Sequence, residues 1–290
     1  MFDVRLAVST DIRNLVPTST VLKITSRDNP LLRHARAVRD GKARESIFVE
    51  GLRLCEEALR SNLKIDSVIF SEQIAKKDRA ARLIEELESV AGKSASISEK
   101  LLATISFTKT PQGIIVLAAR PQLTVSEFKK RQSTRPLLVI LHGINNPVNV
   151  GAILRTAEAA GATGVVITTG TADPYSSKSL RGAMGAAFRL PVWNGPRLQQ
   201  VIDFCREQDI RTVATRAAAS NGYLDFDWRK PFALIMGGES TGLTDEELAA
   251  ADAIVTIPMQ GSTESLNVAV AAGILLYEAN RQRANAAIES

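Results

Sequence analysis

Three short stretches in the second half of the chain are rich in glycine and polar residues, and each follows an apolar run. The stretches cover residues 145–156, 237–243 and 265–269. The runs before them are Leu137–Leu141, Phe232–Met236 and Ala253–Ile257. Each stretch leads into a helix-like pattern, so the apolar runs are typical of strands in an open α/β sheet. Such sheets bind ligands at the carboxyl ends of their strands, and we therefore expect the three stretches to form one site.

Apolar runs and amphipathic helical patterns alternate along most of the chain, which predicts an α/β fold. We expect a mainly parallel sheet in residues 136–290. Its helices include one over 151–160, ended by Gly161, and one over 177–188. Thr244 and Glu247 have the spacing of a capping box at the start of a further helix.

A smaller α/β domain is expected over residues 21–120. Residues 1–20 are interpreted as a loose N-terminal arm, and the polar, proline-bracketed segment 121–135 as a linker.

The net positive charge of the chain comes entirely from its first half. Residues 1–135 hold 24 Lys and Arg against 16 Asp and Glu, a net charge of +8, whereas residues 136–290 carry −3. This asymmetry suggests that an anionic partner, such as a nucleic acid, docks on the first half. Asn29-Pro30 is typical of a helix start, and Arg33, Arg36 and Arg39 follow at three-residue spacing. This basic helix either contacts the partner or is simply a solvated face.

Composition argues against several other classes of protein. The chain has two widely separated cysteines, Cys55 and Cys205, and two histidines, so we expect no metal site. The thiols are interpreted as buried and reduced, which together with the lack of a signal-peptide pattern favours the cytoplasm. No apolar run reaches the length of a membrane span. The phosphate-binding P-loop, the dinucleotide G-x-G-x-x-G fingerprint and the G-x-S-x-G serine elbow are also missing from the sequence.

The middle stretch has residues suited to a ligand. Gly237 and Gly238 lack a Cβ and so permit close approach of the backbone to a ligand. Glu239 follows them and would accept hydrogen bonds, either from a ligand or from amides of the neighbouring loops.

Polar residues of the other two stretches allow two interpretations each. Asn149 and Asn267 stand near predicted helix starts, so each is either a helix cap or a site residue. Arg155 lies in a largely apolar helix near the predicted binding edge. It either binds phosphate or pairs with Glu158 three residues later.

Together, the three stretches resemble the signature of the SpoU/TrmH family of RNA ribose 2′-O-methyltransferases. Residues 146–156 resemble its N-P-x-N-x-G-x-x-x-R-T motif, and residues 237–243 resemble G-x-E-x-x-G-[LI]. Residues 257–271 resemble I-P-M-x-G-x-x-x-S-L-N-V-A-V-A. Three long motifs in the family's order make this resemblance highly specific.

The resemblance implies a C-terminal α/β domain that contains a deep trefoil knot, binds S-adenosylmethionine and forms a homodimer with the active site near the interface. By position, it implies that the cofactor contacts are Thr215, Gly237, Gly238, Ile257 and Leu266. It also implies that the polar residues of the active site are Asn149, Arg155, Glu239, Ser265 and Asn267.

Residues of the first half resemble the small RNA-binding domain of rRNA-directed family members. The likeness lies in residues 26–30, 48–51 and 110–114. It implies ribosomal RNA as the partner, and the arginines expected to contact it are Arg27, Arg33, Arg36 and Arg39.

The expected reaction is methyl transfer from S-adenosylmethionine to a ribose 2′-hydroxyl. A guanidinium with a pKa above about 12 is a poor base. We therefore expect Arg155 to bind phosphate and to stabilise developing alkoxide charge. The alternatives are methylation of tRNA and a non-catalytic factor that binds RNA or assists ribosome assembly.

Overall fold

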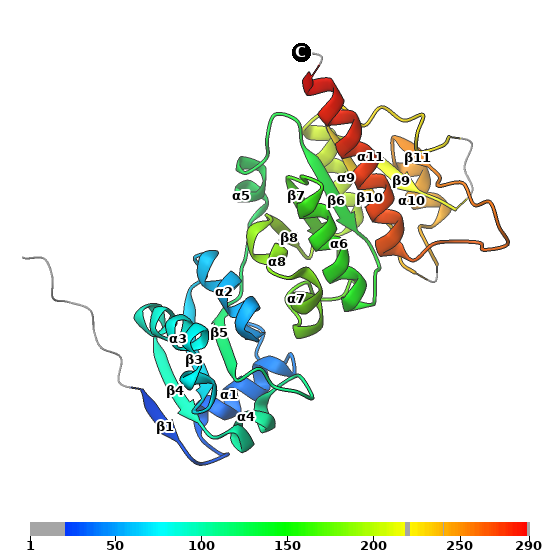
Figure 1. Cartoon of the computed structure of the whole chain (residues 1–290). Helices are drawn as coiled ribbons and strands as arrows, with labels where there is room; N and C mark the ends of the chain where they lie inside the picture. The colour runs from blue at the N-terminus through cyan, green and yellow to red at the C-terminus, as the bar shows by residue number, and fades with distance from the viewer. Residues whose placement is uncertain (1–20, 218–220, 240, 289–290) are drawn as a thin grey trace, which may run out of the picture.

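A computed structural model describes residues 21–217, 221–239 and 241–288 (Figure 1). The predicted loose arm, residues 1–20, lies outside the described residues. The chain forms two β-sheets, one in each half, with helices against both faces of each sheet. The α/β fold class expected from the sequence is confirmed.

The first sheet has five strands in the order β1-β4-β3-β5-β2, with β5 antiparallel to both of its neighbours. Helices α1 and α4 pack on one face of this sheet, and α2 and α3 pack on the other. The strands are β1 Leu22–Ile24, β2 Ser46–Glu50, β3 Ile65–Ser71, β4 Lys93–Ile97 and β5 Ile114–Ala119. The helices are α1 Pro30–Arg39, α2 Leu52–Arg60, the short η1 Ile74–Lys76, α3 Asp78–Val90 and α4 Glu99–Ile105.

The second sheet has six strands in the order β11-β9-β10-β6-β7-β8, and every recorded pairing is parallel. Helices α6, α7, α8 and α11 cover one face, and α5, α9 and α10 cover the other. The strands are β6 Leu137–Leu141, β7 Gly164–Ile167, β8 Val192–Asn194, β9 Arg211–Thr215, β10 Phe232–Met236 and β11 Ala253–Val255. The helices are α5 Val125–Lys130, α6 Pro147–Ala159, α7 Ser177–Ala183, α8 Ala186–Arg189, α9 Leu198–Glu207, α10 Asp245–Ala250 and α11 Val268–Ile288.

Local capping signals account for several helix boundaries. Asn29 caps α1 with Pro30 at its first position, and Thr244 forms the predicted capping box with Glu247. The helix predicted over 177–188 is divided into α7 and α8, because Met184 and Gly185 both take positive φ angles, of 49° and 92°. The helix predicted over 151–160 begins earlier, at Pro147.

The segment that joins the two sheets packs against the second sheet. It contains the short helix α5, whose Phe128 is fully buried. The Phe128 ring lies 5.8 Å from that of Trp193 and 6.0 Å from that of Phe204, between ring centroids. The segment 121–135 therefore contributes an aromatic anchor to the core of the C-terminal half.

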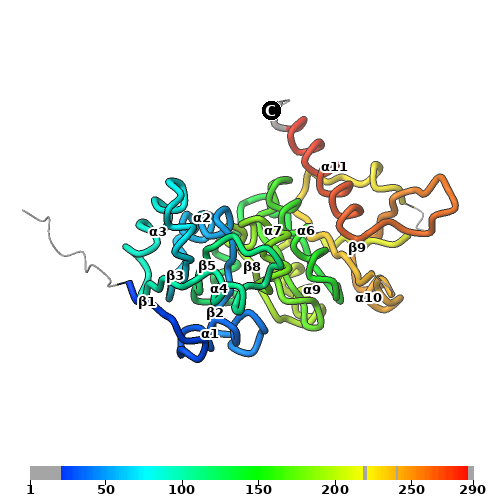
Figure 2. Tube along the Cα trace, turned by 60° about the horizontal axis from the view of Figure 1, so that its bottom comes forward, coloured from blue at the N-terminus to red at the C-terminus, as the bar shows by residue number. Residues whose placement is uncertain are grey.

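The two halves of the chain lie side by side, as Figure 2 shows. Two arginines connect them. The guanidinium of Arg120 forms a two-point ion pair with Asp173 and lies 5.0 Å from the centre of the Tyr175 ring. Arg189 of α8 pairs with both Glu57 of α2 and Glu158 of α6. These contacts connect the first sheet to the layer of helices that carries the first polar stretch.

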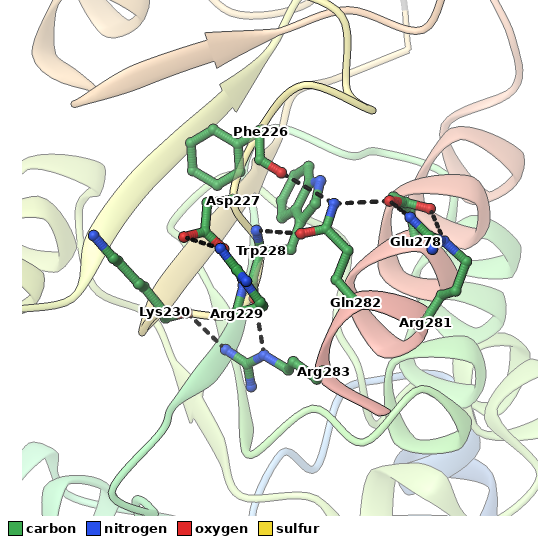
Figure 3. Close-up of polar contacts among 9 residues, drawn as sticks. All are labelled: Phe226, Asp227, Trp228, Arg229, Lys230, Glu278, Arg281, Gln282 and Arg283. Carbon is green, nitrogen blue, oxygen red and sulfur yellow. Dashed lines mark hydrogen bonds and ion pairs between the residues drawn. The ribbon is translucent and has the colours of Figure 1, made fainter. Parts of the chain in front are cut away.

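The last helix, α11, is fixed by polar contacts to the segment that precedes β10 (Figure 3). Arg283 donates hydrogen bonds to four carbonyl oxygens, those of Trp228, Arg135, Pro136 and Lys230, at 2.9–3.1 Å. Burial lowers the pKa of Arg283 from its ordinary value, although a guanidinium stays protonated at neutral pH. Gln282 adds a hydrogen bond from the Trp228 amide, of 3.0 Å. These contacts hold α11, and with it the third polar stretch, in position.

We predict that Arg283→Met lowers the free energy of unfolding by about 2–4 kcal/mol, because it leaves several carbonyl groups without a donor. The matched control is Arg206→Met, which removes a surface ion pair with Asp203 in which both side chains are more than half exposed. The control should cost less than about 1 kcal/mol. Urea denaturation followed by circular dichroism measures both. Equal losses in the two variants would show that the Arg283 contacts add little.

Candidate functional site

The three polar stretches meet at the carboxyl edge of the second sheet. They follow β6, β10 and β11, and β6 and β10 are direct neighbours in register. Residues from the second and third stretches line a cavity of about 600 Å³, a size typical of small-molecule sites. All five residues expected to contact a cofactor are in its wall: Thr215, Gly237, Gly238, Ile257 and Leu266.

The glycine pair after β10 allows two loops to approach closely. A Cβ on Gly237 would lie 2.8 Å from the carbonyl carbon of Gly242, and one on Gly238 would lie 2.6 Å from the carbonyl oxygen of Gly143. A side chain at Gly237 would disturb the fold of its own loop, and one at Gly238 would push this loop away from the loop that follows β6. The glycines are therefore needed for the shape of the cavity.

A chain of side-chain hydrogen bonds connects the three stretches. Asn149 Nδ2 donates to Glu239 Oε1 at 2.9 Å, and Asn267 Nδ2 donates to Asn149 Oδ1 at 3.3 Å. The backbone amide of Asn145 donates to the other oxygen of Glu239 at 3.3 Å. Glu239 thus accepts hydrogen bonds from the loop after β6, as one of its two interpretations predicts.

Glu239 is held in its charged form. Partial burial raises the pKa of this carboxyl group, but the hydrogen bonds from Asn149 and from the backbone amides of Glu239, Asn145 and Asn146 outweigh that effect. The pKa therefore lies below its ordinary value. A depressed pKa stabilises the folded state above the unfolded-state pKa, and this contribution is lost as the pH falls through the folded-state pKa. The network is thus complete at neutral pH and weakens only in acid.

The structure contradicts one interpretation of Asn149 and supports one of Asn267. Asn146 caps α6, because its side chain accepts the Val148 amide at 2.9 Å. Asn149 is buried within the first turn, so its interpretation as a cap is wrong. Asn267 does accept the Ala269 amide at the start of α11, at 2.9 Å, and also donates to Asn149. Asn267 therefore has both a capping contact and a contact within the site.

Arg155 lies outside the cavity of its own chain. It is exposed on α6, and within the described part of the chain it has no ion pair. Of its two interpretations, pairing with Glu158 is wrong, because Glu158 pairs with Arg189 of α8 instead. Glu239, Ser265 and Asn267 line the cavity, and Asn149 joins them through its hydrogen bonds. Ser240, in the second stretch, lies outside the described residues.

Further residues that were not predicted from the sequence also line the cavity, and Arg216, Met259 and Glu264 are among them. Arg216 directly follows Thr215 at the end of β9 and lies 3.5 Å from a carboxylate oxygen of Asp245. The signal in the sequence that could have identified Arg216 is its position directly after a predicted strand. Met259 falls within the third family motif, but its exposure to the cavity depends on the fold of the loop.

The four arginines expected to contact RNA fall into two groups. Arg27 and Arg33 are exposed, and neither has an ion pair among the described residues. Arg36 is half-buried and donates to the Arg27 carbonyl oxygen at 2.8 Å. Arg39 pairs with Asp40 and donates to the carbonyl oxygens of Thr104 and Ser106, which joins α1 to the end of α4. Arg36 and Arg39 thus have structural contacts, whereas Arg27 and Arg33 present their charge to solvent.

Two further features of the described residues concern metal ions and membranes. They contain no group of three or more His, Cys, Asp or Glu side chains arranged to hold a metal ion. None of the described helices combines the length and the apolar character needed to cross a membrane.

Comparison with known proteins agrees with the site. Residues 136–277 match the model of the SpoU rRNA Methylase family, and residues 19–116 match that of the MRM3-like substrate binding domain. The chain belongs to the SpoU methylase family.

Individual relatives cover nearly the whole chain. An uncharacterised tRNA/rRNA methyltransferase of Synechocystis is 31% identical over 92% of this chain and 96% of its own length. The 23S rRNA guanosine 2′-O-methyltransferase RlmP of Bacillus subtilis is 30% identical over 80% of this chain and 87% of its own. The crystal structure of an AdoMet-bound rRNA methyltransferase from Sinorhizobium meliloti is similar, with a TM-score of 0.80 and 31% identity over 90% of this chain and 98% of that one.

We predict that Gly238→Ala weakens binding of S-adenosylmethionine, the ligand expected from the sequence, by about tenfold or more. The added methyl group would collide with the Gly143 carbonyl and displace the cavity wall. Gly261→Ala is the matched control, because no atom lies within 4 Å of a Cβ at this nearby loop position. Isothermal titration calorimetry measures both variants. Equal affinity in the two would mean that the glycine contact does not shape the binding site.

Proposed function

We propose that this protein transfers a methyl group from S-adenosylmethionine to a ribose 2′-hydroxyl of RNA, and that the RNA is ribosomal. The observation that carries the proposal is the cavity at the carboxyl edge of the parallel sheet, walled by glycine backbone and bordered by the linked side chains of Asn149, Glu239 and Asn267. The family match and the rRNA 2′-O-methyltransferases among the relatives support the same reaction.

The residues of the cavity suit S-adenosylmethionine. Its volume of about 600 Å³ accommodates a nucleoside with an amino-acid tail. Backbone at Gly237, Ile257 and Leu266 is available to hydrogen-bond an adenine edge and to pack against it. When bound, this cofactor supplies a methyl group activated on a sulfonium.

The side chains around the cavity then have distinct tasks. Asn149, Glu239 and Asn267 fix the three loops relative to one another, which orients the reacting groups. The hydroxyl group of Ser265 lies in the cavity wall and is placed to hydrogen-bond the incoming ribose. Arg155 binds the adjacent phosphate and stabilises the negative charge that develops on the 2′-oxygen.

We also propose a homodimer formed through the C-terminal half. Val148, Val270 and Tyr277, on α6 and α11, are each more than half exposed, and these two helices pack against each other. Exposed apolar side chains on adjoining helices are typical of an interface. Arg155 lies on the same exposed side of α6 as Val148 but outside the cavity of its own chain. In the dimer, Arg155 would act in the partner's cavity.

The remaining features of the proposal concern the arrangement of the chain. Residues 21–120 form the RNA-binding domain, and residues 121–135 link it to the methyltransferase domain of residues 136–290. The C-terminal segment forms the trefoil knot of the family, a proposal supported by the family match over residues 136–277. The protein acts in the cytoplasm, where thiols stay reduced, and both of its cysteines are free and buried. Burial raises the pKa of Cys205 to about 12, so this thiol is unreactive.

Transfer of a labelled methyl group tests the reaction directly. The protein is incubated with a 23S rRNA transcript and S-adenosylmethionine that carries a deuterated methyl group, and the RNA is digested to nucleosides for mass spectrometry. We predict a labelled 2′-O-methyl nucleoside. Label on a base, label in tRNA but not in rRNA, or binding of RNA without transfer would refute the proposed reaction or substrate.

The placement of Arg155 predicts complementation between two inactive variants. Arg155→Ala should bind S-adenosylmethionine normally and lose about 100-fold in methyl transfer. Gly238→Ala should bind the cofactor at least about tenfold more weakly, so it is nearly inactive when S-adenosylmethionine is kept well below the dissociation constant of this variant. Mixed and refolded together, the two should recover about a quarter of wild-type activity, because half of the dimers are mixed and each has one complete site. No recovery would mean that Arg155 acts within its own subunit.

A further inference from the structure

A second, smaller cavity lies between the two halves of the chain. Its volume is about 200 Å³. One wall is the turn between α1 and β2, and the other is the segment that leads into α7. The polar and charged side chains that argue for a ligand are those of Arg39, Arg44, Ser46, Arg120, Tyr175 and Ser177.

The charges in this cavity are not fully balanced. Asp40 pairs with Arg39, and Asp173 pairs with Arg120. Arg44 has no carboxylate partner within the described residues, and its one recorded hydrogen bond, to the Gly41 carbonyl oxygen, is long at 3.5 Å. Both acidic groups are thus neutralised, and the guanidinium of Arg44 keeps most of its donors for a ligand.

A hydroxyl group on the opposite wall also lacks a partner. Ser177 Oγ is buried, and no hydrogen-bond partner for it is present in the part of the chain that the structure describes. A buried polar atom without a partner is costly in free energy and is rare in folded proteins. Ser177 and Arg44 both line this cavity, so a ligand that accepts hydrogen bonds there would satisfy both once the Ser177 hydroxyl turns toward it.

We propose that this cavity binds one backbone phosphate of the RNA substrate, held by Arg44 from the N-terminal half and Ser177 from the C-terminal half. Both groups donate hydrogen bonds, and a phosphate oxygen accepts them with charge assistance from the guanidinium. The inference rests on the proposed function, because it takes RNA as the substrate. It adds a contact that requires both halves of the chain at once.

The surroundings of the cavity favour RNA over a free anion. Helix α7 starts at the cavity and packs against α6, where the absence of side chains at Gly151 and Gly182 lets the two helices approach closely. Lys178 and Arg181 are exposed along α7, and neither has an ion pair among the described residues. These charges mark a path from the cavity toward α6, which carries the first polar stretch. A strand bound at the cavity would therefore extend toward the methyl-transfer site.

The salt dependence of RNA binding tests the contact of Arg44. Binding of a 23S rRNA transcript is measured by filter retention between about 50 and 200 mM salt, for the full-length wild type, Arg44→Gln and Arg82→Gln. Arg82→Gln is the control because it makes the same change in charge. Arg82 is exposed on α3, which packs on the face of the first sheet opposite to α1. We expect Arg44→Gln to weaken binding about tenfold at low salt and to reduce the salt slope by about one, and Arg82→Gln to do neither.

Ser177→Ala gives an independent test, since it removes a hydroxyl that has no partner among the residues the structure describes. The variant should melt at the wild-type temperature or above, yet bind RNA about threefold or more weakly. Combined with Arg44→Gln, it should lose less affinity than the product of the two single losses, because both groups bind the same phosphate. Displacement of the transcript from the wild type, but not from Arg44→Gln, by inorganic phosphate at constant ionic strength would instead assign the cavity to a free anion.

Wild-type affinity and salt slope in both Arg44→Gln and Ser177→Ala would overturn the inference. Failure of the wild type to bind or methylate the transcript would instead overturn the proposed function, and would be seen before any variant is compared. The two failures are therefore distinguishable.

Discussion

The carboxylate of Glu239 is the interaction on which the arrangement of the site depends. Its oxygens accept hydrogen bonds from Asn149 and from the Asn145 amide, and Asn149 accepts a bond from Asn267. These residues follow three different strands, β6, β10 and β11, so one acidic side chain connects loops that are distant in sequence. Hydrogen bonds to a charged group are each worth about 1.5–3 kcal/mol, enough to hold exposed loops in one arrangement.

The parallel sheet and its helices position the loops that carry this network. Parallel strands place all their carboxyl ends at one edge of the sheet. Helices packed on both faces bury the strands and hold them in place. Helix α11 closes the arrangement, because Arg283 ties its far end to carbonyl groups at the start of β6 and near β10. The N-terminal half is held to the same helical layer by Arg120 and Arg189, so a substrate bound there lies at a defined position relative to the cavity.

Much of this was predictable from the sequence, but only where local pattern decides the outcome. Uniformly apolar strands such as Leu137–Leu141 and the capping box at Thr244 behave as expected. The family motifs pointed to Asn149 as a site residue, but local pattern did not predict its contact with Glu239, which spans 90 residues of sequence, or that Asn146 would be the cap. Likewise, Glu158 is only three residues from Arg155 in the sequence, but it pairs with Arg189, which the fold brings near. Spacing along one helix cannot reveal a partner from another.

The central claim is that Asn149 and Glu239 act as one unit that shapes the methyl-donor cavity. A double-mutant cycle measured by calorimetric titration of S-adenosylmethionine tests it most directly, with Asn149→Ala, Glu239→Gln and the combined variant. The account predicts a coupling free energy of about 1–3 kcal/mol, so that the second substitution adds little once the first is made. Strictly additive losses, or cofactor affinity unchanged in all three variants, would contradict it.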